Sequence, residues 1–181
     1  MGLVRQTRLD GLARAPPAPA MPWASRAARS SLFALTQDNG GIVFKTIVLA
    51  LDGSESSDRA LACATTLAKE QGSNVRVVHV VEIVVGRGGG PMPLNEDEIK
   101  ATVERQVKDL ADTGVTAELE IHSVRVGGPA HVIADVAQDA GADLIITGTR
   151  GHTAIAGVLL GSVAQRLLHL AHCPVLVVPH P

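Results

Sequence analysis

From Phe44 onward, short apolar runs alternate with longer segments in which apolar residues recur every three or four positions. The short runs have the length of buried strands and predict strands at 45–51, 75–81, 117–126, 142–147 and 174–178. The longer segments predict amphipathic helices at 56–71, 95–113, 129–140 and 163–172. Strict alternation of strand and helix is typical of a parallel sheet joined by right-handed crossovers. We therefore expect an α/β fold, a three-layer sandwich around a five-stranded parallel sheet with Rossmann-type winding.

Residues that are typical of helix ends support these boundaries. Ser54 or Ser56 is suited to cap the first predicted helix, Gly72 to end it, and Pro129 to occupy the first turn of the third. Ligands of open parallel sheets bind at the carboxyl ends of the strands, where the winding direction reverses. If the first and fourth predicted strands are the central neighbours, the residues that follow them, Asp52 and Gly148, meet at that crevice.

Small residues cluster between the fourth predicted strand and the last helix. Gly148 and Gly151 are followed, after nine residues, by Gly161 and Ser162. We expect the first two glycines to adopt backbone angles that a side chain would forbid and to bring amide N–H groups close to an anion. Gly161 and Ser162 stand where a helix begins with unpaired N–H groups. The spacing predicts an anion site there, most simply for a phosphate chain.

Composition excludes several classes of function. The chain has one Trp, two Phe and no Tyr, all before residue 45, so it lacks the aromatic platforms typical of single-stranded nucleic-acid binders. An adenine ring would have to lie between aliphatic side chains. No apolar run reaches the length of a membrane span, so we expect neither a nucleic-acid nor a membrane partner. Two cysteines 110 positions apart fit no disulfide or metal pattern and favour a reducing, cytoplasmic location.

Residues 1–43 differ from the rest of the chain. Five arginines against two aspartates give this segment a net charge of +3, which leaves −5 for the following 138 residues of a chain with a net charge of −2. Four prolines between positions 16 and 22 argue against an amphipathic targeting helix. We expect 1–43 to be a disordered extension, or an artefact of where translation is assumed to start, and 44–181 to be the folded domain.

Four motifs, in this order, resemble the universal stress protein family: Ile47–Ser54, Val78–Val81, Gly148-x2-Gly151-x9-Gly161-Ser162, and Cys173–Val178. The resemblance covers about residues 44–179 and is specific because each motif lies on the expected element. It implies the adenine nucleotide alpha-hydrolase-like fold, ATP bound at the carboxyl edge of the sheet, with or without Mg²⁺, and a homodimer. It places Asp52 at the ribose or metal side and the Val80 backbone at adenine. It assigns the phosphates to Gly148, Gly151, Gly161 and Ser162, and further nucleotide contacts to Arg150 and Val163.

The chain departs from the ATP-binding branch of this family in one respect. Members often carry Lys or Arg in the nine-residue stretch after the second glycine, whereas residues 152–160 here contain neither. Only Arg150 and His152 can supply positive charge. The loss of one charge-assisted hydrogen bond, about 1.5–3 kcal/mol, would weaken the preference for ATP over ADP or AMP by roughly tenfold or more.

Other interpretations of the same residues stay open. Asp52 can be a simple turn residue, and the glycine set can be tight turns with an ordinary helix cap. His79 is expected to be packed and hydrogen-bonded, and His169 and His172, although three positions apart, lack a third metal ligand. The final strand, Val175, Leu176, Val177 and Val178, would be an aggregation-prone edge unless a second copy covers it.

Three functions compete at this stage. The leading hypothesis is a nucleotide-responsive regulatory module in stress response, with unknown protein partners and at most weak ATPase or self-phosphorylation activity. The alternative is a nucleotide-independent dimeric interaction module of the same fold, which the missing basic residue favours. An ATP-consuming transferase on a related scaffold is the third, and no residue near the glycines is an obvious catalytic base.

Overall fold

The computed structural model describes residues 44–83, 96–125, 128–151 and 160–179. The predictions made for 1–43 and for His152 lie outside these residues. Five strands and four helices follow in strict alternation along the described chain: β1 (Thr46–Ala50), α2 (Glu55–Gln71), β2 (Asn74–Ile83), α3 (Glu96–Asp112), β3 (Ala117–Arg125), α4 (Pro129–Asp139), β4 (Leu144–Gly148), α5 (Ser162–Leu170) and β5 (Val175–Val178).

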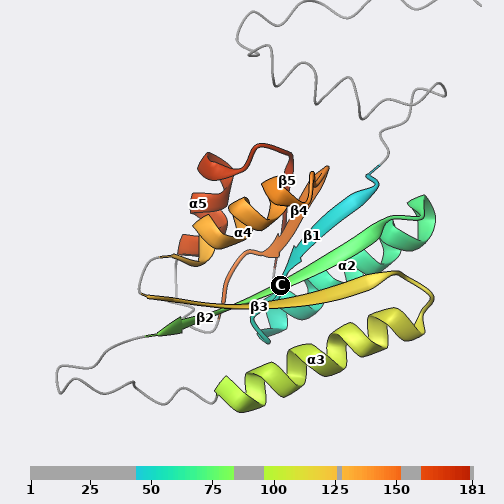
Figure 1. Cartoon of the computed structure of the whole chain (residues 1–181), viewed down its shortest axis with the longest axis horizontal. Coiled ribbons are helices and arrows are strands. Elements are labelled where there is room, and N and C mark those ends of the chain that lie inside the picture. The colour runs from blue at the N-terminus through green and yellow to red at the C-terminus, as the bar shows by residue number, and fades with distance from the viewer. Residues whose placement is uncertain (1–43, 84–95, 126–127, 152–159, 180–181) are drawn as a thin grey trace, which may run out of the picture.

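The strands form one parallel sheet in the order β3-β2-β1-β4-β5. The helices α2 and α3 cover one face and α4 and α5 the other, which gives three layers (Figure 1). The predicted fold class is therefore confirmed, including the adjacency of the first and fourth strands. Because the winding direction reverses between β1 and β4, the crevice expected of such sheets lies at their carboxyl ends.

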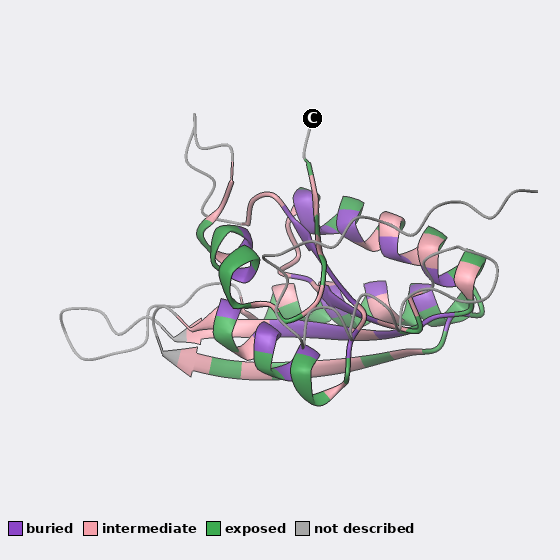
Figure 2. Cartoon of the chain, turned by 90° about the horizontal axis from the view of Figure 1, so that it is seen from above, coloured by how far each residue is buried: buried purple, intermediate pink, exposed green. Residues whose placement is uncertain are grey.

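Residues of the inner strands face alternate sides of the sheet and form two apolar cores. Ile47 and Leu49 of β1 pack with α2 and α3, whereas Val48 belongs to the core beneath α4 and α5. All three are completely buried. The buried stripe of each helix faces the sheet and its outer surface is exposed, as Figure 2 shows. This two-sided burial explains why the inner strands read as continuous apolar runs.

Local signals in the sequence account for the helix ends. The Ser54 hydroxyl accepts a hydrogen bond from the Ser57 N–H and caps α2, and Gly72 ends that helix in the left-handed conformation, with φ of 68°. Pro129 opens α4 as expected. The helix α5 ends at Leu170, two residues before the predicted end, because Ala171 is already extended, with ψ of 138°.

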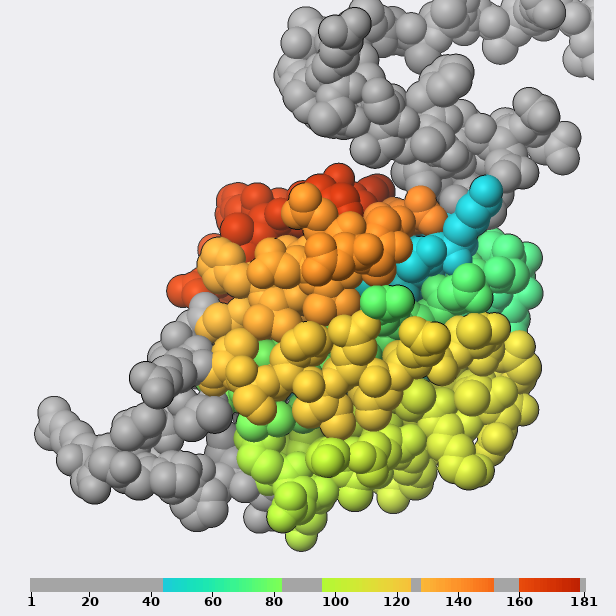
Figure 3. All heavy atoms as spheres, viewed as in Figure 1, coloured from blue at the N-terminus to red at the C-terminus, as the bar shows by residue number. Residues whose placement is uncertain are grey.

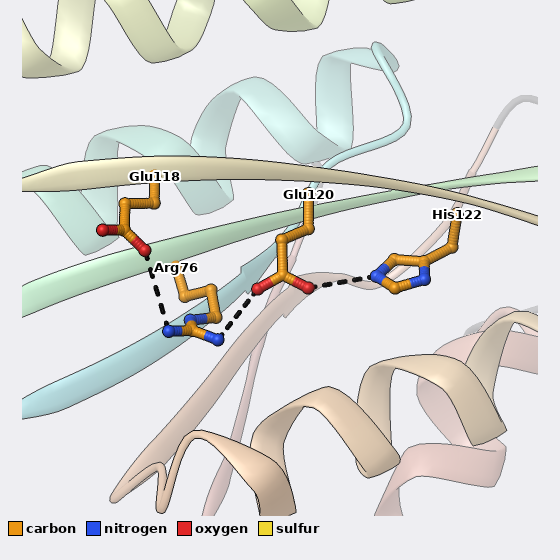
Figure 4. A network of polar contacts seen from close by, with 4 residues as sticks. All are labelled: Arg76, Glu118, Glu120 and His122. Atoms are coloured by element: carbon orange, nitrogen blue, oxygen red, sulfur yellow. Dashed lines mark hydrogen bonds and ion pairs between the residues drawn. The ribbon is translucent and has the colours of Figure 1, made fainter.

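The edge strand β3 carries a polar network on the α4 and α5 side of the sheet, where its side chains keep access to solvent. Glu120 accepts from Arg76 Nη1 of β2 at 2.9 Å and lies 3.1 Å from His122 Nε2, while Glu118 lies 3.7 Å from Arg76 Nη2 (Figure 4). In the space-filling view the β3 atoms reach the surface between α3 and α4 (Figure 3). The alternation of charged and apolar residues along β3 therefore reflects its place at the edge of the sheet, where one row of side chains keeps access to solvent.

Candidate functional site

The candidate site is built around the exits of β1 and β4, which the sheet places side by side. Ile47, Val48 and Leu49 of β1 pair with Leu144, Ile145 and Ile146 of β4. The chain leaves β1 through Asp52 toward the start of α2 and leaves β4 through Thr149 to Gly151. Residues about 100 positions apart in the sequence therefore converge on one edge of the sheet.

Asp52 is held by the turn that joins β1 to α2. Its Oδ1 accepts from the Ser54 N–H at 3.0 Å and from the Ser54 hydroxyl at 2.6 Å. This is the local bonding of an Asx turn, so the interpretation of Asp52 as a turn residue describes a real part of its role. The same bonds fix the carboxylate, and they leave Oδ2 directed toward the β4 exit.

Gly151 lies against that second carboxylate oxygen. A Cβ atom built on Gly151 would overlap Asp52 Oδ2 and would lie 3.7 Å from Asp52 Cγ. A side chain at 151 would therefore displace the Asp52 carboxylate, so the glycine lets this carboxylate remain at the β4 exit. Both residues are partly exposed, so the pair is open to solvent and can meet a ligand.

Gly148, the last residue of β4, makes a similar approach to α2. A Cβ atom at this position would overlap Ser56 Oγ and would lie 2.9 Å from both the Cβ and the carbonyl carbon of Ser56. Ser56 is 3% exposed, and its hydroxyl accepts from the Arg150 N–H at 3.3 Å. The sequence offered Ser56 only as a possible helix cap, a role that Ser54 fills.

The expectation about glycine backbone angles is wrong for this site. The described glycines with positive φ are Gly53, Gly72, Gly114 and Gly141, and none of them belongs to the glycine motif. Gly148 and Gly151 are needed instead because a Cβ would collide with Ser56 or Asp52. The motif is thus explained by close packing of two strand exits, which no local sequence pattern reveals.

Two main-chain amides of the connection between β4 and α5 are bonded within the protein, and one of them, Gly161, is a predicted donor to phosphate. The Gly161 N–H donates to the Thr149 carbonyl at 2.6 Å, and the Arg150 N–H to Ser56 as described. The Gly161 bond joins the two ends of the connection between β4 and α5. A Cβ atom built on Gly161 would lie 3.1 Å from the Thr149 carbonyl oxygen. Gly161 and Arg150 therefore shape the connection, and the expectation of an unpaired Gly161 amide is wrong.

The start of α5 keeps the character of an anion site. Gly161 is its N-cap and contributes no side-chain hydrogen bond, so Ser162 and Val163 begin the helix without the cap that Ser54 gives α2. Ser162 is exposed, and Val163 is partly buried against the core beneath α4 and α5. First-turn N–H groups and the helix dipole favour negative charge at this end.

Val80 and His79 lie on β2, next to the β1 exit. Val80 is partly buried and packs with the α4 and α5 core, opposite His122 of β3. His79 is 3% exposed, and its Nδ1 lies 2.8 Å from the Leu51 carbonyl, so Nδ1 carries the proton. The prediction of a packed, hydrogen-bonded histidine is confirmed. The bond fixes the residue that directly precedes Asp52.

The part of the chain that the structure describes contains no group of three His, Cys, Asp or Glu side chains placed to hold a metal ion. Of its helices, none combines the length and the apolar character needed to cross a bilayer.

Cys173 is partly buried near the β4 start, and burial, with the Asp143 charge, raises the pKa of its thiol to about 11.

A five-stranded parallel sheet with helices on both faces and its winding reversed between β1 and β4 defines a doubly wound α/β protein, and comparison with known proteins agrees with this class. The family model described as Universal stress protein family matches residues 44–179. Universal stress protein MJ0531 of Methanocaldococcus jannaschii is 37% identical over 147 residues, which cover 79% of this chain and 86% of that protein. A universal stress protein of Thermus aquaticus is 40% identical over 140 residues, covering 75% and 99%. The chain therefore belongs to the universal stress protein family.

Solved structures of similar fold include members of the same family. Hypothetical protein MJ0577 superimposes with a TM-score of 0.64 at 27% identity, over 77% of this chain and 99% of that one. An Archaeoglobus fulgidus universal stress protein in complex with dAMP gives 0.55 at 28% identity, over 76% and 99%. A universal stress protein in complex with cAMP gives 0.54 at 26% identity, over 76% and 98%.

Proposed function

We propose that this protein is an adenine-nucleotide-binding regulatory module of the stress response, with the crevice between the β1 and β4 exits as its binding site. The observation that carries the proposal is the approach of Asp52 to Gly151 at the point where the sheet reverses its winding. Similar proteins have been solved with dAMP and cAMP, which supports an adenine nucleotide as the ligand class.

Each residue would have a distinct role toward the nucleotide. The Asp52 carboxylate, fixed by Ser54, would accept from a ribose hydroxyl, or hold a metal ion where one accompanies the phosphates. The first turn of α5, Ser162 and Val163, would donate N–H groups to phosphate oxygens. The backbone at Val80 would meet the adenine edge, with aliphatic side chains on the ring faces.

ATP is the ligand that the motif resemblance favours, and ADP and AMP are its competitors. Residues 152–160 contain no Lys or Arg, so few positive charges are available for terminal phosphates. We expect the preference for ATP over ADP or AMP to be weaker, by roughly tenfold or more, than with a basic residue in that stretch. The protein would act through the shape of the nucleotide-bound surface, with at most slow ATP hydrolysis.

A homodimer through β5 completes the proposal. This strand pairs only with β4 among the described elements, and Leu176 leaves 36% of its surface exposed. An unpaired apolar edge strand is stabilised when a second copy pairs with it around a two-fold axis. A cytoplasmic location is consistent with the two free thiols.

Calorimetric titration with ATP, ADP and AMP tests the proposed site. Gly161→Glu places a carboxylate and added bulk at the start of α5, so it should abolish the binding heat. Ala111→Glu, on the exposed side of α3, adds the same charge away from the crevice and should bind as the wild type does. Equal heats for wild type and Gly161→Glu would refute the site.

A nucleotide-independent interaction module is the second candidate, because the Arg150 and Gly161 amides are bonded internally. It predicts no binding heat for wild-type protein and the same oligomeric state with and without nucleotide. Light scattering coupled to size exclusion, run in both conditions, separates the two functions. Mass spectrometry of small molecules that co-purify with the protein gives an independent answer.

A further inference from the structure

We propose that Ser56 is a positioning residue of the crevice: its buried hydroxyl holds the Arg150 amide and thereby fixes the β4 exit against α2. This role rests on the proposed nucleotide binding, because it concerns the geometry of that site. The resemblance did not assign any function to Ser56, and the sequence offered it only as an alternative cap.

The contacts of Ser56 differ from those of its neighbour Ser57. Both serines lie in the first turn of α2, and both are almost completely buried, at 3% and 2% exposed. The Ser57 hydroxyl donates to the Ser54 carbonyl at 2.8 Å, within its own turn. The Ser56 hydroxyl accepts from Arg150, 94 positions away. One serine therefore serves the helix, and the other connects it to β4.

Gly148 provides the space that this connection needs. A side chain at 148 would overlap the Ser56 hydroxyl and crowd its Cβ and carbonyl carbon at 2.9 Å. Since the main chain of Ser56 is fixed within α2, the collision could not be relieved by a rotamer change. Gly148 and Ser56 are thus complementary, and the close approach that they allow brings Arg150 within reach of the hydroxyl.

The Ser56 bond acts on the residues that would meet the nucleotide. Ser56 follows Asp52 by four positions, and Arg150 directly precedes Gly151, which lies against Asp52. The Ser56–Arg150 bond and the Asp52–Gly151 contact are therefore two parallel bridges between the same strand exits. Without the hydroxyl, the Arg150 N–H loses its acceptor and the second bridge loses its support.

The experiment compares Ser56→Ala with the matched control Ser57→Ala in the full chain. Hydrogen exchange of the Arg150 amide is measured by NMR without nucleotide, and affinities for ATP and AMP by calorimetry. For Ser56→Ala we expect exchange at Arg150 to accelerate, and both nucleotides to bind more weakly, each by roughly three- to tenfold, as for loss of one neutral hydrogen bond. Ser57→Ala should change either quantity by less than about twofold, because its bond is local to the helix.

Three results would overturn the role of Ser56: unchanged exchange at Arg150, faster exchange with unchanged affinity, or an equal loss of affinity in Ser57→Ala. The last result would show that a weakened start of α2 is sufficient. A wild-type protein that binds neither nucleotide would instead refute the proposed function, and the role of Ser56 with it. Wild-type binding with an unaffected Ser56→Ala variant refutes the role of Ser56 alone.

Discussion

Gly151→Ala and Gly148→Ala should separate nucleotide binding from folding, although both glycines belong to one motif. At 151 the added methyl group meets the end of the Asp52 side chain, which can swing away into solvent. At 148 it meets the main chain and Cβ of buried Ser56, which cannot. The same substitution therefore has different consequences three residues apart.

The magnitudes follow from these contacts. In Gly151→Ala, displacement of Asp52 costs its bonds to Ser54 and its contact with the nucleotide, and one charge-assisted hydrogen bond corresponds to about 1.5–3 kcal/mol. We expect binding to weaken by roughly 10- to 150-fold. Tm should change little, because Asp52 and Ser54 are partly exposed and water replaces the bonds that they lose. In Gly148→Ala, overpacking should lower the free energy of unfolding by about 1–3 kcal/mol and Tm by about 5–10 °C.

Calorimetric titration and thermal unfolding of the same samples measure both quantities. Asp52→Asn serves as a control for Gly151→Ala, because it removes the carboxylate charge with almost no change in volume and should weaken binding similarly. Wild-type affinity in Gly151→Ala, or equal losses of Tm in the two glycine variants, would refute this account of the motif.

Three further outcomes follow from other parts of the molecule. Burial and the Asp143 charge raise the pKa of the Cys173 thiol to about 11, so its alkylation at pH 8 should be roughly a hundredfold slower than that of free cysteine. The alkylation rate should rise about tenfold per pH unit up to pH 10. A plateau of this rate below pH 9, measured by site-resolved mass spectrometry, would contradict the prediction. Gly72→Ala should destabilise the protein by about 1–2 kcal/mol in denaturant unfolding, because its φ of 68° strains any other residue. Leu176→Lys on β5 should yield monomers in sedimentation experiments. The control Ile121→Lys, at a position of similar exposure (38%) on the β3 edge, should leave the dimer intact. Unchanged dimers in Leu176→Lys would exclude the β5 interface.

The sequence was sufficient to predict the fold because each element carries its own periodic signal. Strands buried on both faces read as apolar runs, and caps such as Ser54 and Gly72 act within a few residues of themselves. The adjacency of β1 and β4 was an inference from the usual winding of such sheets, and the observed strand order confirms it. Helix and strand ends differ from their predicted positions by at most two residues, as at Leu170, where tertiary packing decides the boundary.

The interior of the site was less accessible to sequence reasoning. The spacing of Gly148 and Gly151 indicates a site but predicts unusual backbone angles for them, because a sequence does not show which atoms will lie opposite a missing Cβ. Ser56 was missed for the same reason: its partner, Arg150, is distant along the chain, and only the folded sheet brings them together. The assignment of Asp52, Val80, Ser162 and Val163 to a nucleotide remains a prediction.

The unequal borders of the sheet limit how far copies of this protein can associate. One border, β3, displays Glu118, Glu120 and His122, and Arg76 of the neighbouring β2 lies beside them. These ionic groups disfavour the addition of another strand there. The opposite border, β5, is short and apolar. Growth by strand addition would need two receptive borders on each molecule, and this chain has one. Association through β5 would therefore stop at two copies, and fibrous growth is suppressed without any additional domain.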